Sequence, residues 1–195
     1  MWLRRRASCN GNPKLNALRR GSKLILLDDV TISVLVEREI DGEKVPEPFG
    51  IRSAQVKAYR QIHEEIRAAQ QHKDDGLGGL SGARWLQLIP GFLLRTFIRS
   101  ASRSVRMMRR FGAIGVTAVG MFGEGALWFV PLSRATVAVT VGSIVERPVA
   151  VEGRIESREH LCLTVSFNHD IVDGAPAARF LKRFGEVMKS GEVLR

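Results

Sequence analysis

The hydrophobic pattern changes from helical to extended near residue 111, and this change constrains the fold more than any other feature of the sequence. Before it, Arg84–Arg110 places apolar residues at helical spacing, with a break or kink near Pro90. After it come β-branched runs bounded by Gly, Pro or charged residues: 113–119, 136–145, 149–151 and 161–168. Antiparallel strands beside separate helices predict an α+β fold in which helices cover a sheet.

The remaining segments give a coarse outline of the other elements. Glu152-Gly153 is expected to turn a hairpin. Asp173 can cap a final helix that runs to about Lys189, with an apolar face formed by Ala177, Phe180, Leu181, Phe184 and Met188. The first half predicts strands over 23–27 and 30–36, a turn at Asp41-Gly42, a helix over 51–69 and a Gly-rich loop over 72–82.

Two basic segments account for the net charge of +10 that the 195 residues carry. Residues 1–23 hold seven basic residues, residues 84–110 hold seven arginines, and neither segment contains an acid. The excess points to an anionic partner, which is nucleic acid, a membrane surface or a phosphate-bearing ligand. Nucleic acid is disfavoured because one tyrosine and no known binding module accompany the charge. One predicted helix face collects Arg95, Arg99, Arg103, Arg106 and Arg110. This face fits peripheral contact with an anionic membrane surface, nucleic-acid phosphate or the phosphates of coenzyme A, and the alternative is a solvated face over a core-facing stripe.

Cysteine and histidine usage excludes several classes of site. Two cysteines, Cys9 and Cys162, are too few for a disulfide framework or a four-thiolate zinc site. The other histidines lack metal-ligand spacing, so no metal is expected: His63, His72 and His160. The charged start has no apolar signal core behind it, and no run reaches the ~18 apolar residues of a membrane span. These features favour a cytoplasmic protein.

The motif with the clearest chemical content lies between the last predicted strand and the last helix. His169, Asp173 and Gly174 form a His-x-x-x-Asp-Gly sequence. His169 continues the alternation of the strand's apolar face, so its imidazole is predicted to be partly buried at the strand end; that face is Leu161, Leu163, Val165 and Phe167. A neutral imidazole there can act as general base for a thiol or hydroxyl. The alternative is a structural histidine followed by an ordinary Asp-Gly turn.

Four stretches of the chain together resemble one known family. Residues 163–169 and 177–181 place the histidine motif between a Leu/Ser/Phe strand and an Ala-Ala-Arg-Phe-Leu helix. Residues 142–149 read Gly-Ser-Ile-Val-Glu-Arg-Pro-Val, and residues 29–34 read Asp-Val-Thr-Ile-Ser-Val. All four are similar to the catalytic domain of the 2-oxo acid dehydrogenase acyltransferases, the dihydrolipoamide acyltransferases related to chloramphenicol acetyltransferase. The resemblance implies a chloramphenicol-acetyltransferase-like mixed sheet covered by helices.

The resemblance also implies roles for individual residues. His169 falls on the general base, and Thr117 falls on a serine whose hydroxyl hydrogen-bonds the oxyanion of the tetrahedral intermediate. Threonine keeps that hydroxyl donor and adds a methyl group. The alternative for Thr117 is a strand threonine beside a Gly-rich turn. Asp173 joins the catalytic set as the residue that holds the loop, and Asn168 and Gly174 are expected to be structural at the site.

The implied activity is acyl transfer between thiols. Its partners are coenzyme A or acyl-CoA and a thiol acceptor, with lipoamide as a candidate for the second thiol, and no cofactor is covalently bound. The implied assembly is a homotrimer or a higher multiple, in which histidine and hydroxyl come from different chains. Residues 1–13 are expected to be an irregular basic N-terminus. Residues 14–195 then form the catalytic domain, stand-alone and N-terminally short, with a divergent basic amphipathic helical segment over 84–110. The alternative is a catalytically inactive protein of this fold that binds a partner or a membrane surface.

Overall fold

The computed structural model of the chain describes residues 12–40, 43–71, 91, 95, 109–120, 125–133 and 135–191. The strands of this part are β1 (Ala17–Arg20), β2 (Lys23–Leu26), β3 (Ile32–Ile40), β4 (Glu43–Ile51), β5 (Ile114–Ala118), β6 (Val137–Val151) and β7 (Arg154–Phe167). The α-helices are α1 (Tyr59–Gln71) and α4 (Gly174–Ser190), and short 3-10 helices cover Pro13–Asn16 and Ala54–Val56. None of the helices in the described part is long and apolar enough to cross a membrane.

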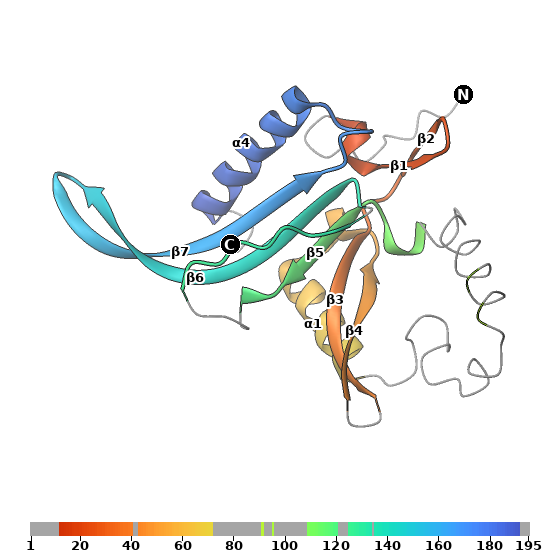
Figure 1. The fold of residues 1–195 in the computed structure, drawn as a ribbon, viewed down its shortest axis with the longest axis horizontal. Helices are drawn as coiled ribbons and strands as arrows, with labels where there is room; N and C mark the ends of the chain where they lie inside the picture. Colours follow the sequence, from red (N-terminus) through yellow and green to blue (C-terminus); the bar gives the residue numbers. More distant parts are fainter. Residues whose placement is uncertain are drawn as a thin grey trace.

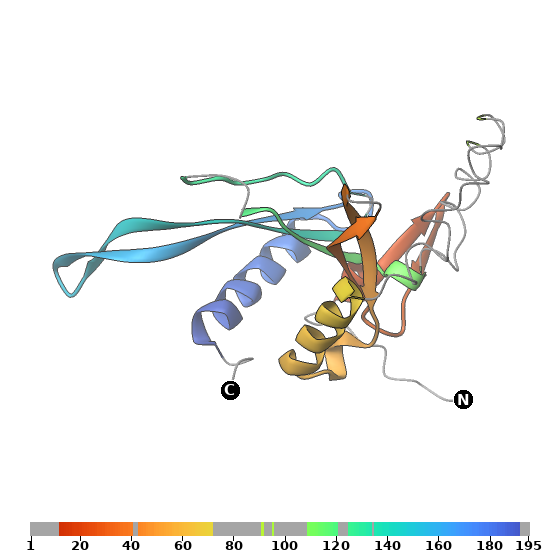
Figure 2. The same ribbon diagram turned by 90° about the horizontal axis from the view of Figure 1, so that it is seen from below.

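A five-stranded mixed sheet forms the centre of the molecule, in the order β4-β3-β5-β6-β7. β5 runs parallel to β3 and β6, and the two outer pairs, β3–β4 and β6–β7, are antiparallel. α1 and α4 lie on one face of this sheet, whereas residues 125–133 run over the other face (Figure 1 and Figure 2). The predicted α+β fold, a mixed sheet covered by helices, is confirmed.

The two faces of the sheet carry different kinds of side chain, because residues in register share a face and successive residues alternate. The helix-covered face is apolar: Ile114, Val137, Val165 and Phe167 pack in one core cluster with Ala177 and Phe180 of α4. The Phe167 and Phe180 rings meet edge to face, with centroids 5.7 Å apart. The opposite face is small and polar, with register rows of Ser33, Gly115, Ala138 and Ser166, and of Thr117, Thr140 and Thr164. Small side chains leave room above that second face.

The β6–β7 hairpin is longer than the sequence pattern predicts. Val151 pairs with Arg154, and Glu152 and Gly153 have φ angles of 50° and 80°, so the turn predicted at these two residues is confirmed. β6 continues without interruption through Pro148, although the sequence suggested separate strands on either side of it. The proline is tolerated because β5 pairs only with the first part of β6, which leaves one edge of β6 free at Pro148. The distal half of the hairpin projects from the body (Figure 1).

The first half of the chain departs from the prediction in two places. The predicted strands on either side of Asp28-Asp29 exist, but they lie in different sheets, since β2 pairs with β1 and β3 joins the central sheet. The helix expected over 51–69 begins only at Tyr59. Before it, Ile51 ends a strand and Ala54–Val56 form the short 3-10 helix. That strand, β4, was not predicted; it is an edge strand whose prolines disguise it because proline cannot donate to a sheet.

The loop predicted over 72–82 lies outside the described residues. The same is true of most of the basic segment over 84–110, although Arg95 and Arg110 are helical and exposed.

The β1–β2 hairpin is anchored to the central sheet through buried polar groups. The Asn16 side-chain amide donates to the carbonyl oxygens of Leu27, at 3.1 Å, and Asp29, at 3.0 Å. The Thr136 hydroxyl, just before β6, donates to the Ala17 carbonyl oxygen. Leu15 and Ala17 also enter the core cluster that contains Ile171 and Val172. These contacts hold the hairpin beside the turn that follows β7.

Candidate functional site

The histidine loop, residues 168–173, connects the end of β7 to the start of α4. Asn168 shapes it: its backbone N–H donates to the Thr136 carbonyl oxygen at 3.0 Å, and its own carbonyl oxygen accepts from the N–H groups of Ile171 and Val172, both at 3.0 Å. The Asn168 side-chain Oδ1 accepts from the Asp170 N–H at 3.1 Å. The loop is therefore a closed turn with a defined backbone, whose tip carries His169.

His169 is exposed, in contrast to the partly buried position predicted from strand alternation. The difference arises because β7 ends at Phe167, so the alternation of the strand no longer determines where the His169 side chain lies. Asp173 occupies the N-cap position of α4 and is also exposed, and its side chain makes no capping hydrogen bond. Gly174 is the first residue of the helix. The imidazole is thus presented on the surface of a single chain.

Thr117 lies in β5, half-buried, on the small and polar face of the sheet. It lines a cavity of about 1020 Å³. Other described residues that line this cavity come from β1, β3, the segment before β6, β6 itself and the histidine loop; among them are Arg20, Ser33, Ser133, Asn168 and Asp170. The structure therefore brings the predicted hydroxyl donor and the histidine loop to one cavity, although they are far apart in sequence.

One chain brings the histidine loop, but not His169 itself, to the cavity that Thr117 lines. The described residues that line the cavity include both neighbours of His169 but not His169 itself. Thr117 is in register with Thr140, which is in register with Thr164, whereas the neighbouring Val165 packs on the helix side. Thr117 consequently lies on the face of the sheet opposite to α4.

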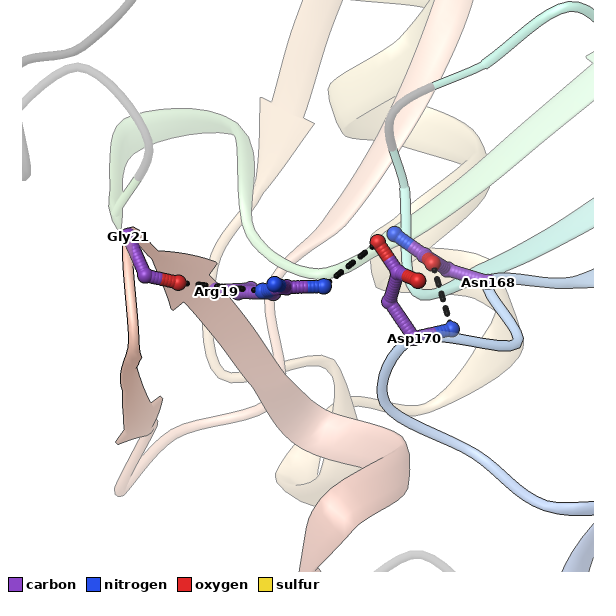
Figure 3. Close-up of polar contacts among 4 residues, drawn as sticks. All are labelled: Arg19, Gly21, Asn168 and Asp170. Atoms are coloured by element: carbon purple, nitrogen blue, oxygen red, sulfur yellow. Dashed lines mark hydrogen bonds and ion pairs between the residues drawn. The ribbon is translucent and has the colours of Figure 1, made fainter.

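An ion pair fastens the histidine loop to the β1–β2 hairpin. Arg19 Nη1 lies 2.6 Å from Asp170 Oδ2, and Arg19 Nε donates to the Gly21 carbonyl oxygen at 3.0 Å (Figure 3). Sequence reasoning missed both charged residues. The position of Asp170 directly after the motif histidine was a usable signal for its part in the site. Nothing in the spacing of the basic N-terminal segment singles out Arg19.

The remaining candidate groups do not add to the site. Cys162 is buried, and its Sγ lies 4.0 Å from the Ser143 hydroxyl oxygen. His63 and His160 are exposed, and His160 Nδ1 lies 2.9 Å from the carbonyl oxygen of Arg158. In the described ranges, no group of three or more His, Cys, Asp and Glu side chains could hold a metal ion.

Comparison with known proteins connects this arrangement to a family. Residues 101–194 match the model of the 2-oxoacid dehydrogenases acyltransferase catalytic domain. The chain is 27% identical over 186 residues to the dihydrolipoyllysine-residue succinyltransferase component of the 2-oxoglutarate dehydrogenase complex of Staphylococcus saprophyticus. This match covers 93% of this chain and 36% of that protein. It is 25% identical over 179 residues to the lipoamide acyltransferase component of the branched-chain alpha-keto acid dehydrogenase complex of Bacillus subtilis, covering 91% and 35%. The chain thus spans about a third of the length of these relatives.

Solved structures confirm the fold. The chain superposes on dihydrolipoamide acetyltransferase of Azotobacter vinelandii with a TM-score of 0.56 at 21% identity, covering 94% of this chain and 64% of that one. The cubic core of a pyruvate dehydrogenase multienzyme complex gives a TM-score of 0.57 at 20% identity, with the same coverage of 94% and 64%. The resemblance predicted from the histidine motif and from residues 142–149 is confirmed.

Proposed function

We propose that this chain, which matches the 2-oxoacid dehydrogenase acyltransferase catalytic domain over residues 101–194, moves an acyl group between two thiols, one of them that of coenzyme A. His169 is the general base and Thr117 the oxyanion donor. The observation that carries the proposal is the cavity lined both by Thr117 and by the histidine loop. Thioester exchange requires a hydroxyl donor, which Thr117 supplies at the cavity, and a base, which is the exposed imidazole that the histidine loop carries beside it.

The similar enzymes support the assignment of these roles. A serine, a histidine and an asparagine have been investigated for their role in the catalytic mechanism of the Azotobacter vinelandii acetyltransferase, and that histidine and asparagine are four positions apart. His169 and Asp173 have the same separation. Threonine in place of serine keeps a hydroxyl donor, and aspartate in place of asparagine keeps a side chain that can brace the loop. The two curated relatives, a succinyltransferase and a lipoamide acyltransferase, suggest lipoamide as the second thiol.

The reaction proceeds through one tetrahedral intermediate. The imidazole of His169 takes the proton of the acceptor thiol, and the resulting thiolate attacks the thioester carbonyl carbon. The carbonyl π electrons move to oxygen, and the oxyanion accepts a hydrogen bond from the Thr117 hydroxyl. Collapse of the intermediate re-forms the carbonyl and breaks the bond to the leaving thiolate, which recovers the proton from the imidazolium. Asp173 acts through the loop and does not touch the reacting atoms.

The active unit is a homotrimer or a higher multiple with its sites between chains. One chain presents His169 on its surface, while Thr117 faces a cavity on the opposite side of the sheet from α4. A neighbouring chain that inserts its exposed imidazole at this cavity completes the pair. This arrangement is supported by the exposed position of His169, which does not line the cavity of its own chain.

An assay of acyl exchange tests the proposal. The purified protein is incubated with acetyl-, succinyl- and branched-chain acyl-CoA and with dihydrolipoamide, and S-acyl product is measured by mass spectrometry beside the oligomeric mass. His169→Ala is expected to lower kcat by about 10²–10⁴-fold, since the base is lost. Thr117→Val is expected to lower it by about 10²–10³-fold, while Thr117→Ser keeps most of the activity.

His160→Ala is the matched control, because it removes an exposed histidine remote from the cavity. Full activity in a folded His169→Ala variant contradicts the assignment. Absence of turnover with every acyl-CoA in an assembled wild-type protein favours the alternative, a catalytically inactive binding protein of the same fold.

A further inference from the structure

A second cavity, of about 330 Å³, lies between the β1–β2 hairpin and the histidine loop. We call it the basic pocket. Its polar lining consists of Lys14, Arg19, Ser22, Lys23 and Asp170. Three cations therefore face one carboxylate, and the hairpin cannot compensate the excess because residues 12–27 contain no acid. The pocket has an unbalanced positive charge, a hydroxyl donor and a volume suited to a small anion.

The Arg19 guanidinium is held in place before any ligand arrives. Its Nε donates to the Gly21 carbonyl oxygen at 3.0 Å, and its Nη1 contacts Asp170 Oδ2 at 2.6 Å, so that the group spans the gap between hairpin and loop (Figure 3). Arginine has more N–H donors than these two contacts use. The contact to Gly21 can hold the guanidinium at the pocket while the unused donors, and then the one on Asp170, turn to a ligand oxygen.

The contact to Asp170 is one that an incoming anion can replace. The side chains of Arg19 and Asp170 are 48% and 66% exposed, so water screens the ion pair and its net stabilisation is small. A phosphate carries more negative charge than a carboxylate and has more acceptor oxygens, which suits the fork of arginine together with two ammonium groups. Asp170 is then a competitor of the ligand for the same guanidinium.

We propose that the basic pocket binds a phosphate group, held by Arg19, Lys14 and Lys23 in competition with Asp170. The inference does not depend on the proposed activity, since it concerns binding alone. It also bears on that activity, because Asp170 directly follows His169 and belongs to the loop that carries the imidazole. An anion that draws Arg19 away from Asp170 releases one of the fastenings of the loop that carries the imidazole.

Isothermal titration calorimetry of the full chain with sodium pyrophosphate at fixed ionic strength tests the inference. Wild type is expected to bind with one saturable site per chain. Arg19→Gln is expected to weaken binding by about tenfold, because a charge-assisted hydrogen-bond donor is lost. Asp170→Asn is expected to tighten binding by about threefold, because the competing carboxylate is neutralised. Arg179→Gln on the exposed surface of α4 removes the same charge outside the pocket and is expected to change little.

Two results would overturn the inference. Equal weakening by Arg19→Gln and Arg179→Gln means that the anion responds to diffuse charge and not to the pocket. Unchanged or weaker binding by a folded Asp170→Asn variant means that Asp170 does not compete, whatever Arg19→Gln does. A further titration identifies the source of the phosphate: displacement of pyrophosphate by coenzyme A assigns the pocket to the phosphates of that substrate, and simultaneous binding of both assigns it to a free phosphate.

Discussion

At the scale of single residues, Thr136 and Thr140 each bury a side-chain hydroxyl, but only the hydroxyl of Thr136 has a hydrogen-bond partner among the described residues. Thr136 is fully buried, its hydroxyl donates to the Ala17 carbonyl oxygen, and its N–H donates to the Ala113 carbonyl oxygen at 2.8 Å. Thr140 is 2% exposed, and its hydroxyl has no hydrogen-bond partner among the described residues. A satisfied buried hydroxyl stabilises a fold, whereas an unsatisfied one carries the cost of removing it from water.

Replacement of each threonine by valine, which has the same shape, is therefore expected to have opposite signs. Thr136→Val leaves the Ala17 carbonyl without its donor and should lower the free energy of unfolding by about 1–3 kcal/mol. Thr140→Val removes a buried hydroxyl that has no hydrogen bond to offset its loss of water, and should raise the free energy of unfolding by about 1 kcal/mol. Urea denaturation followed by circular dichroism measures both. A decrease of similar size in the two variants would show that the Thr140 hydroxyl is satisfied.

The residue scale also shows what the sequence can and cannot reveal about the site. The His-x-x-x-Asp-Gly motif is local, so its position between strand and helix could be predicted. The exposure of His169 could not, because it depends on the single residue at which β7 stops pairing. Arg19 and Asp170 are brought together only by the tertiary fold, and no spacing along the chain records that contact.

At the scale of elements, β6 contains a register shift between Val141 and Ile144, and the segment 125–127 is hydrogen-bonded to β6 at this shift. Within it, the Ser143 hydroxyl donates to the Gly125 carbonyl oxygen at 2.5 Å and accepts from the Leu127 N–H at 2.9 Å. Gly142 allows the close approach, because an added Cβ would overlap the Leu127 carbonyl oxygen. The shift thus holds residues 125–127 against β6, on the side of the sheet where Thr117 lies.

Two glycine-to-alanine substitutions separate this packing role from the general effect of a methyl group. Gly142→Ala is expected to destabilise the protein by about 1–3 kcal/mol, since the backbone of residue 127 must move away. Gly185→Ala in α4 meets no atom within 4 Å and should stabilise the protein by about 0.5–1 kcal/mol, because alanine favours the helix. Thermal unfolding measures both. A stable Gly142→Ala variant would contradict the close approach.

The elements that could be predicted are those whose own pattern repeats over many residues. β6 and β7 have runs of alternating residues, and the turn between these two strands requires positive φ. α4 has apolar residues at helical spacing. β4 was missed because its prolines suppress the strand signal, and proline is acceptable there only because the strand lies at the sheet edge. Edge position is a property of the assembled sheet, so a local pattern cannot contain it.

At the scale of the whole molecule, the sheet places the two groups that the proposed reaction needs at different positions, Thr117 on its polar face and His169 beyond the end of β7. On its helix side, sheet residues and α4 pack in one core cluster. On its polar side lie Thr117 and the larger cavity. His169 is exposed at the end of the sheet, beyond the last pairing of β7. A site formed between chains uses this placement, because every copy then contributes an imidazole to one neighbour and a hydroxyl to the other.

Mixed assemblies of two inactive variants test this directly. His169→Ala supplies an intact Thr117, and Thr117→Val supplies an intact His169, so an interface between them restores one complete site. A trimeric ring that contains both variants always has one of its three interfaces joining the right pair, so about a third of the wild-type kcat per chain should return in the mixed rings. Co-expression with two affinity tags, followed by the acyl-exchange assay on the doubly tagged fraction, measures it. The same variants mixed after assembly, without subunit exchange, are the control and should stay inactive. If base and hydroxyl belonged to one chain, no interface would combine them, and the co-expressed mixture would be as inactive as its components.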